Sequence, residues 1–525
     1  MPTRQHLYIT IFILLAFVFA ADTTMYAGQL YYPKIGDSYI LTPKAPARPQ
    51  INGPKVFGVR PGSPLLFTIR TTGDRPMTFS AENLPAGCVL NGATGRITGK
   101  IDKQGTYTVK LTAANALGRI SRELRIVVGD TIALTPPMGW NSWNCWAASV
   151  TAEKVLQTAH GMVDSGLINH GWTYINIDEG WQGKRGGPFK GIQGNEIFPD
   201  MQKLCNEIHS LGLKFGVYST PWTNSYGSRI GGTSDHEDGS WDPNTDTKGE
   251  RHFGKYSFLA NDARQWAAWG LDYVKYDWKP NDIPHVEEIA KSLREYGRDI
   301  IFSMSNAAPF KDVETFARYA TCWRTTGDIT DVWDSHPKTE RKAQGIMNFM
   351  NGHERWRPYQ RPGHYNDPDM LVVGNVGWGE KLHPTRLTPD EQYTHISLWC
   401  LWSAPLLLGC PLDKLDAFTI GLLTNDEVLA VNQDPLCIQA ALVSKEGELE
   451  VWAKNLEDGS KAVGLLNRDA VMTNPVTVRW SDLSIGGPQR VRDLWRQQDI
   501  GQYESEFIAA VRPHGVVLIR ISPAD

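Results

Sequence analysis

YINIDEGW, from Tyr174 to Trp181, is the stretch that points to the fold. Four residues with strand character lead directly into two adjacent acids, Asp178 and Glu179. Neighbouring carboxylates repel each other, and core packing gives no reason to place them together at the end of a strand. In a parallel barrel, however, polar side chains at the carboxyl ends of the strands meet on the face that carries active sites. The stretch therefore predicts a barrel strand that ends in a functional site.

Seven further apolar segments accompany this one, separated by longer stretches with a helical pattern. The eight expected strands are Met138–Trp143, Thr173–Glu179, Lys214–Thr220, Leu271–Asp277, Asp299–Ser305, Cys322–Asp328, His364–Leu371 and Ala404–Leu408. Eight such repeats predict a catalytic (β/α)8 TIM barrel over residues 134–438.

The segments on either side of the expected barrel have a β pattern. Residues 30–128 alternate strand-like runs with Gly, Pro and Asn turns, which predicts an immunoglobulin-like β-sandwich. Part of it, Leu84 to Gly118, resembles the immunoglobulin-like modules appended to many secreted bacterial enzymes. It carries no cluster of acids or histidines, so a spacer or packing role is favoured over sugar binding. Residues 439–525 predict a C-terminal antiparallel β-sandwich.

The N-terminus predicts export. Arg4 and His6 precede the apolar run Leu7 to Phe19, and Ala20 is a small residue at a plausible cleavage point, so residues 1–20 read as a signal peptide. No later segment is long and apolar enough to predict a transmembrane helix. The mature protein is expected to be periplasmic or extracellular. Its net charge of −4 gives no reason to expect a nucleic-acid partner.

Two of the expected strands pair a cation with an acid. In YVKYDW, Lys275 and Asp277 are two residues apart and so point to the same side of a strand. In CWRTTGDI, Arg324 is followed by Asp328. Two carboxylates on opposite walls of a pocket are what the cleavage of a glycosidic bond requires. Ion pairs are also ordinary features of barrel rims, and the spacing alone leaves both interpretations open.

Seven motifs occur in a fixed order along the chain: PPMGWNSWN, IDEGW, LKFGVYS, YVKYDW, CWRTTGDI, NDPDMLVVGN and VNQDPL. Together they resemble glycoside hydrolase family 27, which contains α-galactosidases, α-N-acetylgalactosaminidases and β-L-arabinopyranosidases, over roughly residues 134–440. The resemblance implies a barrel with a C-terminal β domain. It also implies a retaining mechanism without a metal or an organic cofactor. The implied substrate is an oligosaccharide or polysaccharide with a terminal galacto-configured sugar.

The resemblance also assigns roles to residues. Asp277 matches the nucleophile and Asp328 matches the acid/base. The residues expected to bind the sugar are Trp143, Asp178, Glu179, Tyr218, Lys275, Ser305, Arg324 and Asp369. For these roles Lys275 has to keep Asp277 ionised, and the pKa of Asp328 has to be raised when substrate arrives.

Three departures from the family pattern leave the substrate open. α-Galactosidases usually have two Asp residues where this chain has Asp178 and Glu179, and a Glu there favours β-L-arabinopyranose, which lacks the C6 hydroxymethyl group. Ser305 and Ala308 are small and leave room for a 2-acetamido group. Trp278 replaces a disulfide-forming Cys of animal relatives, so packing has to stiffen that rim. α-Galactosidase is the leading interpretation, and both acids being present argues against an inactive sugar-binding protein.

Overall fold

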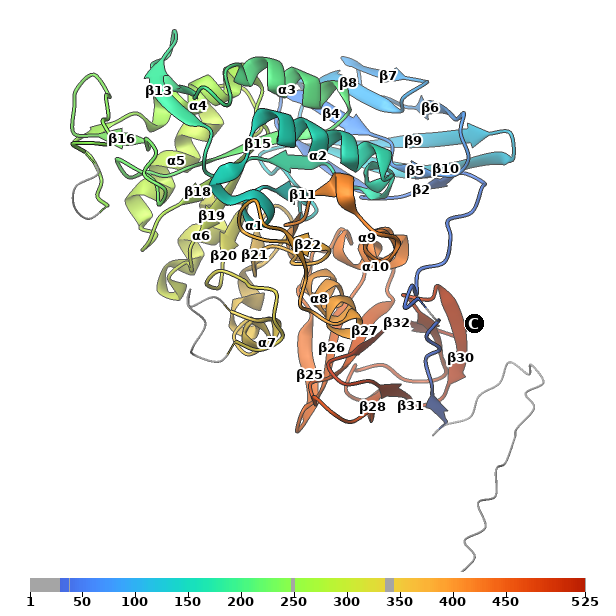
Figure 1. Cartoon of the computed structure of the whole chain (residues 1–525). Helices are drawn as coiled ribbons and strands as arrows, with labels where there is room; N and C mark the ends of the chain where they lie inside the picture. Colours follow the sequence, from blue (N-terminus) through green and yellow to red (C-terminus); the bar gives the residue numbers. More distant parts are fainter. Residues whose placement is uncertain (1–28, 37, 247–250, 336–343, 525) are drawn as a thin grey trace, which may run out of the picture.

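The computed structural model describes residues 29–36, 38–246, 251–335 and 344–524. The expected signal peptide, residues 1–20, lies outside these ranges. Three bodies are seen in Figure 1: a β-sandwich in blue, a barrel from teal to orange and a second sandwich in red. In the described ranges, none of the helices has both the length and the apolar character needed to cross a membrane.

The N-terminal sandwich packs a four-stranded sheet in the order β3-β10-β9-β6 against a three-stranded sheet in the order β4-β8-β7. Its strands are β2 (Gln50–Ile51), β3 (Val56–Val59), β4 (Pro64–Thr68), β5 (Thr71–Thr72), β6 (Thr78–Glu82), β7 (Cys88–Asn91), β8 (Arg96–Lys100), β9 (Gly105–Asn115) and β10 (Gly118–Val128). Along β9 the buried Val109, Leu111 and Ala113 alternate with more exposed residues, as a strand with one face on the core requires. These side chains belong to a core that is separate from that of the barrel.

The segment before residue 50 does not belong to this sandwich. β1 (Leu30–Tyr31) pairs in parallel with β31 (Glu506–Val511) of the C-terminal domain, and the Tyr31 hydroxyl donates a hydrogen bond to Asp493 at 3.0 Å. The expectation of a single module from residue 30 is therefore wrong at its start. The β pattern of Leu30–Tyr31 could not reveal its partner, because the partner lies more than 470 residues further along the chain.

The barrel is one eight-stranded parallel sheet in the order β21-β20-β19-β18-β15-β12-β11-β24. Its strands are β11 (Met138–Asn141), β12 (Tyr174–Asn176), β15 (Lys214–Ser219), β18 (Tyr273–Asp277), β19 (Ile301–Ser305), β20 (Cys322–Arg324), β21 (Tyr365–Asp367) and β24 (Leu406–Leu408). A parallel bridge between Leu371 and Leu408 closes the ring. Both faces of the strands are covered, which explains their nearly continuous apolar character. The predicted barrel and its eight strands are confirmed.

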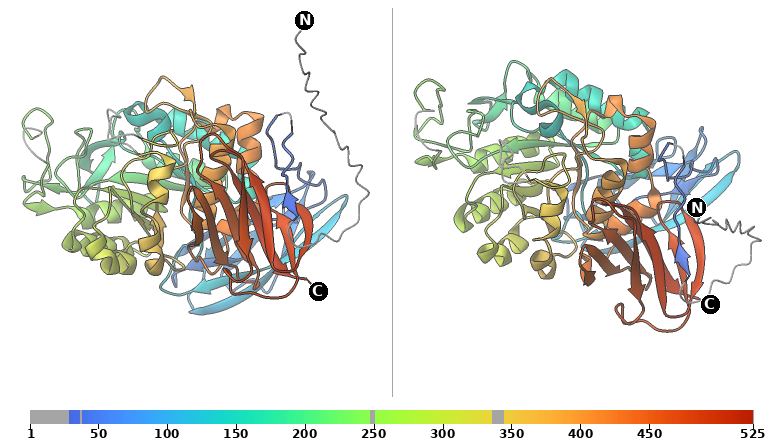
Figure 2. Two further views of the ribbon diagram at one scale, coloured as in Figure 1. Left: turned by 90° about the horizontal axis from the view of Figure 1, so that it is seen from below. Right: turned by 60° about the horizontal axis from the view of Figure 1, so that its bottom comes forward.

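Helices alternate with the strands along the chain and cover the outside of the barrel, except α1, which lies at the cleft (Figures 1 and 2). They are α1 (Trp143–Trp146), α2 (Ala152–Asp164), α3 (Met201–Ser210), α4 (Leu259–Trp269), α5 (Ile283–Glu295), α6 (Val313–Tyr319), α7 (Ile346–Met350), α8 (Pro389–Leu401), α9 (Ala417–Leu423) and α10 (Asp426–Asn432). Side-chain caps fix several starts: Thr151 accepts a hydrogen bond from Lys154 N, and Asp282 accepts one from His285 N.

Five strands end earlier than predicted, and two of them, β11 at Asn141 and β15 at Ser219, are short by only two residues and one residue. The other three end further back. β12 ends at Asn176, β20 at Arg324 and β21 at Asp367, so Asp178, Asp328 and Asp369 lie in the loops that follow. Small hairpins extend other loops on the same face: β13 (Gln182–Gly186) with β14 (Gly191–Gly194), β16 (Thr233–Ser234) with β17 (Tyr256–Ser257), and β22 (Asn375–Val376) with β23 (His383–Pro384). These loops form the walls of the cleft described below.

The C-terminal domain pairs a six-stranded sheet in the order β25-β26-β27-β32-β29-β30 with the three-stranded sheet β1-β31-β28. Its remaining strands are β25 (Ala441–Glu446), β26 (Leu449–Asn455), β27 (Lys461–Asn467), β28 (Asn474–Arg479), β29 (Gln489–Asp493), β30 (Gln498–Tyr503) and β32 (Val516–Pro523). All pairings within it except that of β1 are antiparallel, which confirms the predicted antiparallel domain.

Candidate active site

A cleft of about 1030 Å³ opens at the carboxyl ends of the barrel strands. Nine of the ten predicted site residues line it: Trp143, Asp178, Glu179, Lys275, Asp277, Ser305, Arg324, Asp328 and Asp369. They come from β18, β19 and β20, from the start of α1 and from the loops after β12, β20 and β21. The barrel therefore brings together groups that are almost 230 residues apart in sequence.

Lys275 is the cation in the wall of the cleft next to the candidate nucleophile. Lys275 and Asp277 share one side of β18, but the Lys275 ammonium donates its hydrogen bond to Asp178 Oδ2, at 2.8 Å. Asp178 is further fixed by Ser142 Oγ, which accepts from the Asp178 backbone N–H at 2.9 Å. Lys275 thus lies beside two carboxylates, those of Asp178 and Asp277, and it forms a hydrogen bond with Asp178.

Asp277 lies at the bottom of the cleft and is only 7% exposed. The side-chain amide of Asn306, the residue after β19, donates a hydrogen bond to Asp277 Oδ1. Burial raises the pKa of Asp277 to about 7, and the charges of Asp178 and Asp328 add to this, whereas Lys275 opposes it. Lys275 thus acts in the expected direction, toward the ionised form of Asp277, but burial has the larger effect on this pKa.

Asp328 lies at the mouth of the cleft, with 69% of its side chain exposed. Arg324 Nη2 donates to Asp328 Oδ1 at 3.2 Å. Partial burial acts to raise the pKa of Asp328, but Arg324, Lys275 and Lys279 outweigh it and hold the pKa below its usual range. In the protein alone three cations therefore favour the ionised form of Asp328, and the raised pKa expected when substrate arrives stays a prediction.

Arg324 also joins Asp328 to Asp369. Its Nη1 lies 2.9 Å from Asp369 Oδ1, and its Nη2 donates to the backbone oxygen of Gly327 at 2.8 Å. Asp369 Oδ2 accepts from the backbone N–H of Ile329 at 2.7 Å. The loop that carries Asp328 is consequently held on both sides by Arg324 and Asp369.

Glu179 is anchored by the loop after β15. Its Oε1 accepts from the backbone N–H of Gly227 at 2.6 Å and from the hydroxyl of Ser225. A Cβ at residue 227 would lie 2.6 Å from Glu179 Oε1, so any other residue there would displace the Glu179 carboxylate. Burial raises the pKa of Glu179. Between the two anchoring residues lies Tyr226, which lines the cleft.

Two residues singled out from the sequence do not line the cleft. Tyr218 is 1% exposed, its hydroxyl has no partner among the described residues, and its ring lies behind the wall, 5.6 Å from Lys275 Nζ. Ala308 is buried, and its backbone N–H donates to Arg324 O at 2.7 Å. The argument for a 2-acetamido pocket is therefore reduced to Ser305, which does line the cleft.

Sequence reasoning missed several lining residues, among them Asn306, Tyr226, Trp378, Lys279, His383 and Arg386. Asn306 directly follows a predicted strand end, so the rule that found Ser305 could have found it too. Tyr226 and Trp378 lie in irregular loops, where no periodicity marks a residue as facing the site. Trp278 is fully buried and donates to Asp282 Oδ2 at 3.1 Å, so packing does occupy the position of the missing Cys.

A (β/α)8 barrel with two carboxylates facing a sugar-sized cleft has the architecture of a glycoside hydrolase. The family model described as Alpha galactosidase A matches residues 135–238 and 241–434. Further models match residues 446–521, as the alpha galactosidase C-terminal beta sandwich domain, and residues 48–129, as an Ig domain. The chain therefore belongs to the α-galactosidase family, glycoside hydrolase family 27, and it carries an N-terminal immunoglobulin-like domain.

Individual relatives agree with the family models. Alpha-galactosidase 2 of Arabidopsis thaliana is 37% identical over 399 residues, which cover 74% of this chain and 90% of the relative. The crystal structure of a candidate alpha-galactosidase/melibiase from Bacteroides fragilis is 34% identical with a TM-score of 0.80, covering 91% of this chain and 98% of that one. A family 27 β-L-arabinopyranosidase from Geobacillus stearothermophilus is 28% identical with a TM-score of 0.62, covering 75% and 97%.

Proposed function

We propose that this protein is an exported, retaining α-galactosidase that releases terminal α-D-galactose from galactosides. The observation that carries the proposal is the contrast between the two carboxylates of the cleft. Asp277 is 7% exposed at the bottom, whereas the side chain of Asp328 is 69% exposed at the mouth. The sugar ring enters first and the aglycone leaves toward solvent, so the acid belongs at the mouth and the nucleophile at the bottom.

In the first step, the Asp277 carboxylate attacks the anomeric carbon of the sugar while the bond from that carbon to the glycosidic oxygen breaks. Asp328 gives its proton to the departing oxygen, which leaves as an alcohol. The product of this step is a glycosyl ester of Asp277. Asn306 and Lys275 lie next to Asp277 and stabilise its charge before the attack.

In the second step, Asp328 takes a proton from a water molecule, whose oxygen attacks the anomeric carbon. The ester bond breaks and returns Asp277 to the carboxylate form, with the anomeric configuration retained. Esterification of Asp277 removes one negative charge that faces Asp328, and this lowers the pKa of Asp328 so that it can act as the base. Binding of a sugar also displaces water from the exposed side of Asp328, and this opposes the effect of the three cations on its pKa.

The sugar preference is supported by the curated relatives, which are named as α-galactosidases. A second candidate, β-L-arabinopyranosidase activity, rests on Glu179. Both hydrogen bonds from the loop end on Glu179 Oε1, which leaves Oε2 to face the C4 and C6 side of the sugar. A family 27 β-L-arabinopyranosidase shares the fold, as noted above.

The test is a comparison of kcat/KM for the nitrophenyl glycosides of α-D-galactose, β-L-arabinopyranose and α-N-acetyl-D-galactosamine. The proposal expects the highest value for the galactoside. A higher value for the arabinopyranoside would establish the second candidate, and turnover of none of the three would refute both.

A further inference from the structure

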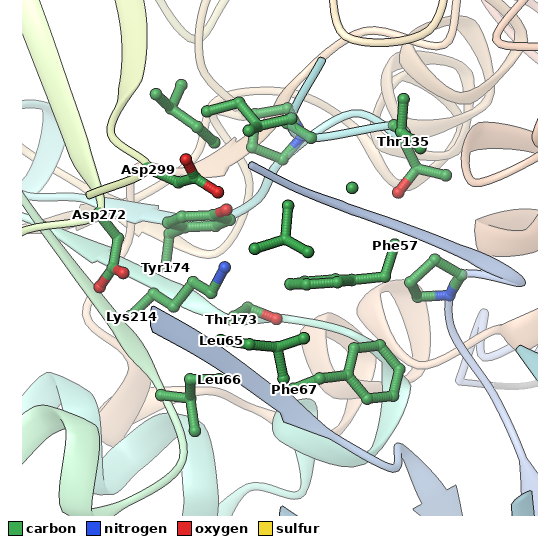
Figure 3. Close-up of a pocket in the computed structure, with 18 of the residues that line it drawn as sticks. Phe57, Leu65, Leu66, Phe67, Thr135, Thr173, Tyr174, Lys214, Asp272 and Asp299 are labelled. Atoms are coloured by element: carbon green, nitrogen blue, oxygen red, sulfur yellow. The ribbon is translucent and has the colours of Figure 1, made fainter. Parts of the chain in front are cut away.

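A second cavity, of about 340 Å³, lies at the opposite end of the barrel, between the barrel and the N-terminal sandwich (Figure 3). One wall comes from β3 and β4 of the sandwich and includes Phe57 and Leu66. The other wall includes Tyr174 and Lys214, the first residues of β12 and β15. The cavity shares no lining residue with the catalytic cleft and lies on the face of the barrel that does not carry active sites.

Lys214 extends into this cavity. Figure 3 shows its amine pointing between the rings of Tyr174 and Phe57, and Nζ lies 5.5 Å and 5.1 Å from their centres. In the part of the chain that the structure describes, no hydrogen bond or ion pair ends on Lys214 Nζ. Burial lowers the pKa of Lys214, and the nearby Arg298 and Arg70 lower it further, against the opposing effect of Asp272 and Asp299.

The two carboxylates in the wall are already occupied by other partners. The Asp272 carboxylate accepts a hydrogen bond from Arg298 Nη2 at 2.7 Å, and its Oδ2 lies 2.8 Å from His209 Nε2. Oδ2 also accepts from the backbone N–H of Phe215. The Asp299 carboxylate accepts two hydrogen bonds from Arg60, one from the side-chain Nε at 2.6 Å and one from the backbone N–H at 2.9 Å. Neither acid neutralises Lys214 by direct contact.

Arg70 is a second cation of this cavity without an acid partner. It is 6% exposed, and its Nη2 donates to Thr173 Oγ1 at 2.9 Å. Its Nη1 has no partner among the described residues. Burial lowers the pKa of Arg70 to about 10. Buried cations are normally paired with an anion, because removing a charge from water is costly.

We propose that this cavity binds a small organic carboxylate with an apolar body. The carboxylate contacts Lys214, the charge of Arg70 nearby adds to the attraction, and the apolar body packs on Phe57, Leu66 and Tyr174. A cavity of about 340 Å³ lies at the lower end of the range of roughly 300 to 1,000 Å³ for small-molecule sites. Such a ligand would contact the sandwich and the barrel together and would link the two domains.

The experiment is a titration of the full-length protein followed by fluorine NMR, with 4-fluorobenzoate as the probe. The expected result is saturable line broadening that unlabelled benzoate reverses. Lys214→Met should weaken the probe's affinity by about tenfold or more, as the loss of one charge-assisted hydrogen bond predicts. Lys214→Arg should retain most of the affinity, and Lys311→Met, a change at an exposed lysine elsewhere, should retain all of it. Circular dichroism establishes that each variant is folded.

Two further measurements use only the natural protein, so they hold whether or not a variant folds. The neutral analogue 4-fluorobenzyl alcohol should bind at least about tenfold more weakly than 4-fluorobenzoate, for the same reason. Inorganic sulfate, which has charge but no apolar body, should fail to displace the probe at equal concentration. The proposal is overturned if the probe does not bind saturably, if the alcohol binds equally well, if sulfate displaces the probe, or if a folded Lys214→Met variant binds it unchanged.

Discussion

Lys275 donates its hydrogen bond to Asp178, at 2.8 Å, rather than to Asp277 two residues further along the same strand. The side chain of Asp178 is 2% exposed and has no other cation in contact among the described residues. Lys275 therefore does two things: it neutralises Asp178 by contact, and it lowers the pKa of Asp277 through space. A change at Lys275 should affect both properties.

Lys275→Met should lower kcat/KM by about 100- to 1,000-fold, because losing one preorganised donor from an active site costs roughly 2.7 to 4 kcal/mol of transition-state stabilisation. It should also move the pKa of Asp277 further upward from about 7, since Lys275 is a cation that opposes the effect of burial. The measurement is kcat/KM as a function of pH, with Lys311→Met as the control. An unchanged upper limb of that profile would contradict the second effect.

The two carboxylates should respond differently to substitution. Asp277→Ala should lose nearly all activity, and azide should partly restore it and give a glycosyl azide of opposite anomeric configuration. Asp328→Ala should retain far more activity on substrates with good leaving groups, because these need little protonation. The measurement is kcat/KM on a pair of galactosides with leaving groups of different acidity. Equal losses for both substrates would rule out Asp328 as the acid.

The pH dependence follows from the order of the two pKa values. Activity needs Asp277 ionised and Asp328 protonated, so it comes from the singly protonated pair, and within it from the minor fraction whose proton is on Asp328. That form appears as the pH rises through the lower pKa, and it is lost as the pH rises through the upper pKa, about 7. The profile of kcat/KM should therefore be bell-shaped, with its alkaline limb near pH 7. An alkaline limb above pH 9 would contradict an upper pKa of about 7 for the pair.

Asp328→Ala separates the two titrations. With a good leaving group the variant needs only an ionised Asp277, so its kcat/KM should rise with pH and then level off, with no alkaline limb near 7. The midpoint should lie somewhat below 7, because the charge of Asp328 raises the pKa of Asp277 in the natural protein. A midpoint near the ordinary aspartate value would show that burial does not raise this pKa.

Much of this site could be predicted from the sequence, and the reason is geometric. Apolar strands that alternate with helices predict a barrel, and in a barrel the carboxyl ends of all the strands lie on one face. That reasoning could find Asp277, Lys275 and Ser305 because each lies among the last residues of a strand. Tyr226 and Trp378 were not, since they lie in loops whose path depends on contacts such as the one between Gly227 and Glu179.

The protonation states could not be predicted from neighbouring residues in the sequence. Lys275 is two residues from Asp277, which pointed to an ionised nucleophile, but burial by the whole barrel outweighs that one charge. Arg324 precedes Asp328 by four residues, yet its contact with Asp369, in the loop after the next strand, is what fixes the loop that carries Asp328. Burial and long-range contacts are properties of the folded chain.

Glu179→Asp should raise the ratio of galactoside to arabinopyranoside activity, because a shorter side chain leaves room for the C6 hydroxymethyl group. A misfit of one methylene is worth about 1 to 3 kcal/mol, or roughly 10- to 200-fold in kcat/KM. The matched control is Ser225→Ala, which removes one donor to Glu179 Oε1 but keeps the length of the acid. A ratio that changes equally in both variants would mean that the loop, and not the reach of the carboxylate, sets the preference.

The central claim is a double displacement at Asp277 with Asp328 as acid and base. Proton NMR of a fresh reaction on nitrophenyl α-D-galactoside tests it most directly, because the first sugar released shows its anomeric configuration before mutarotation. The account predicts that α-D-galactose appears first and that the β anomer grows only afterwards. Release of β-D-galactose as the first product would show inversion, and it would contradict the assignment of Asp277 as a nucleophile.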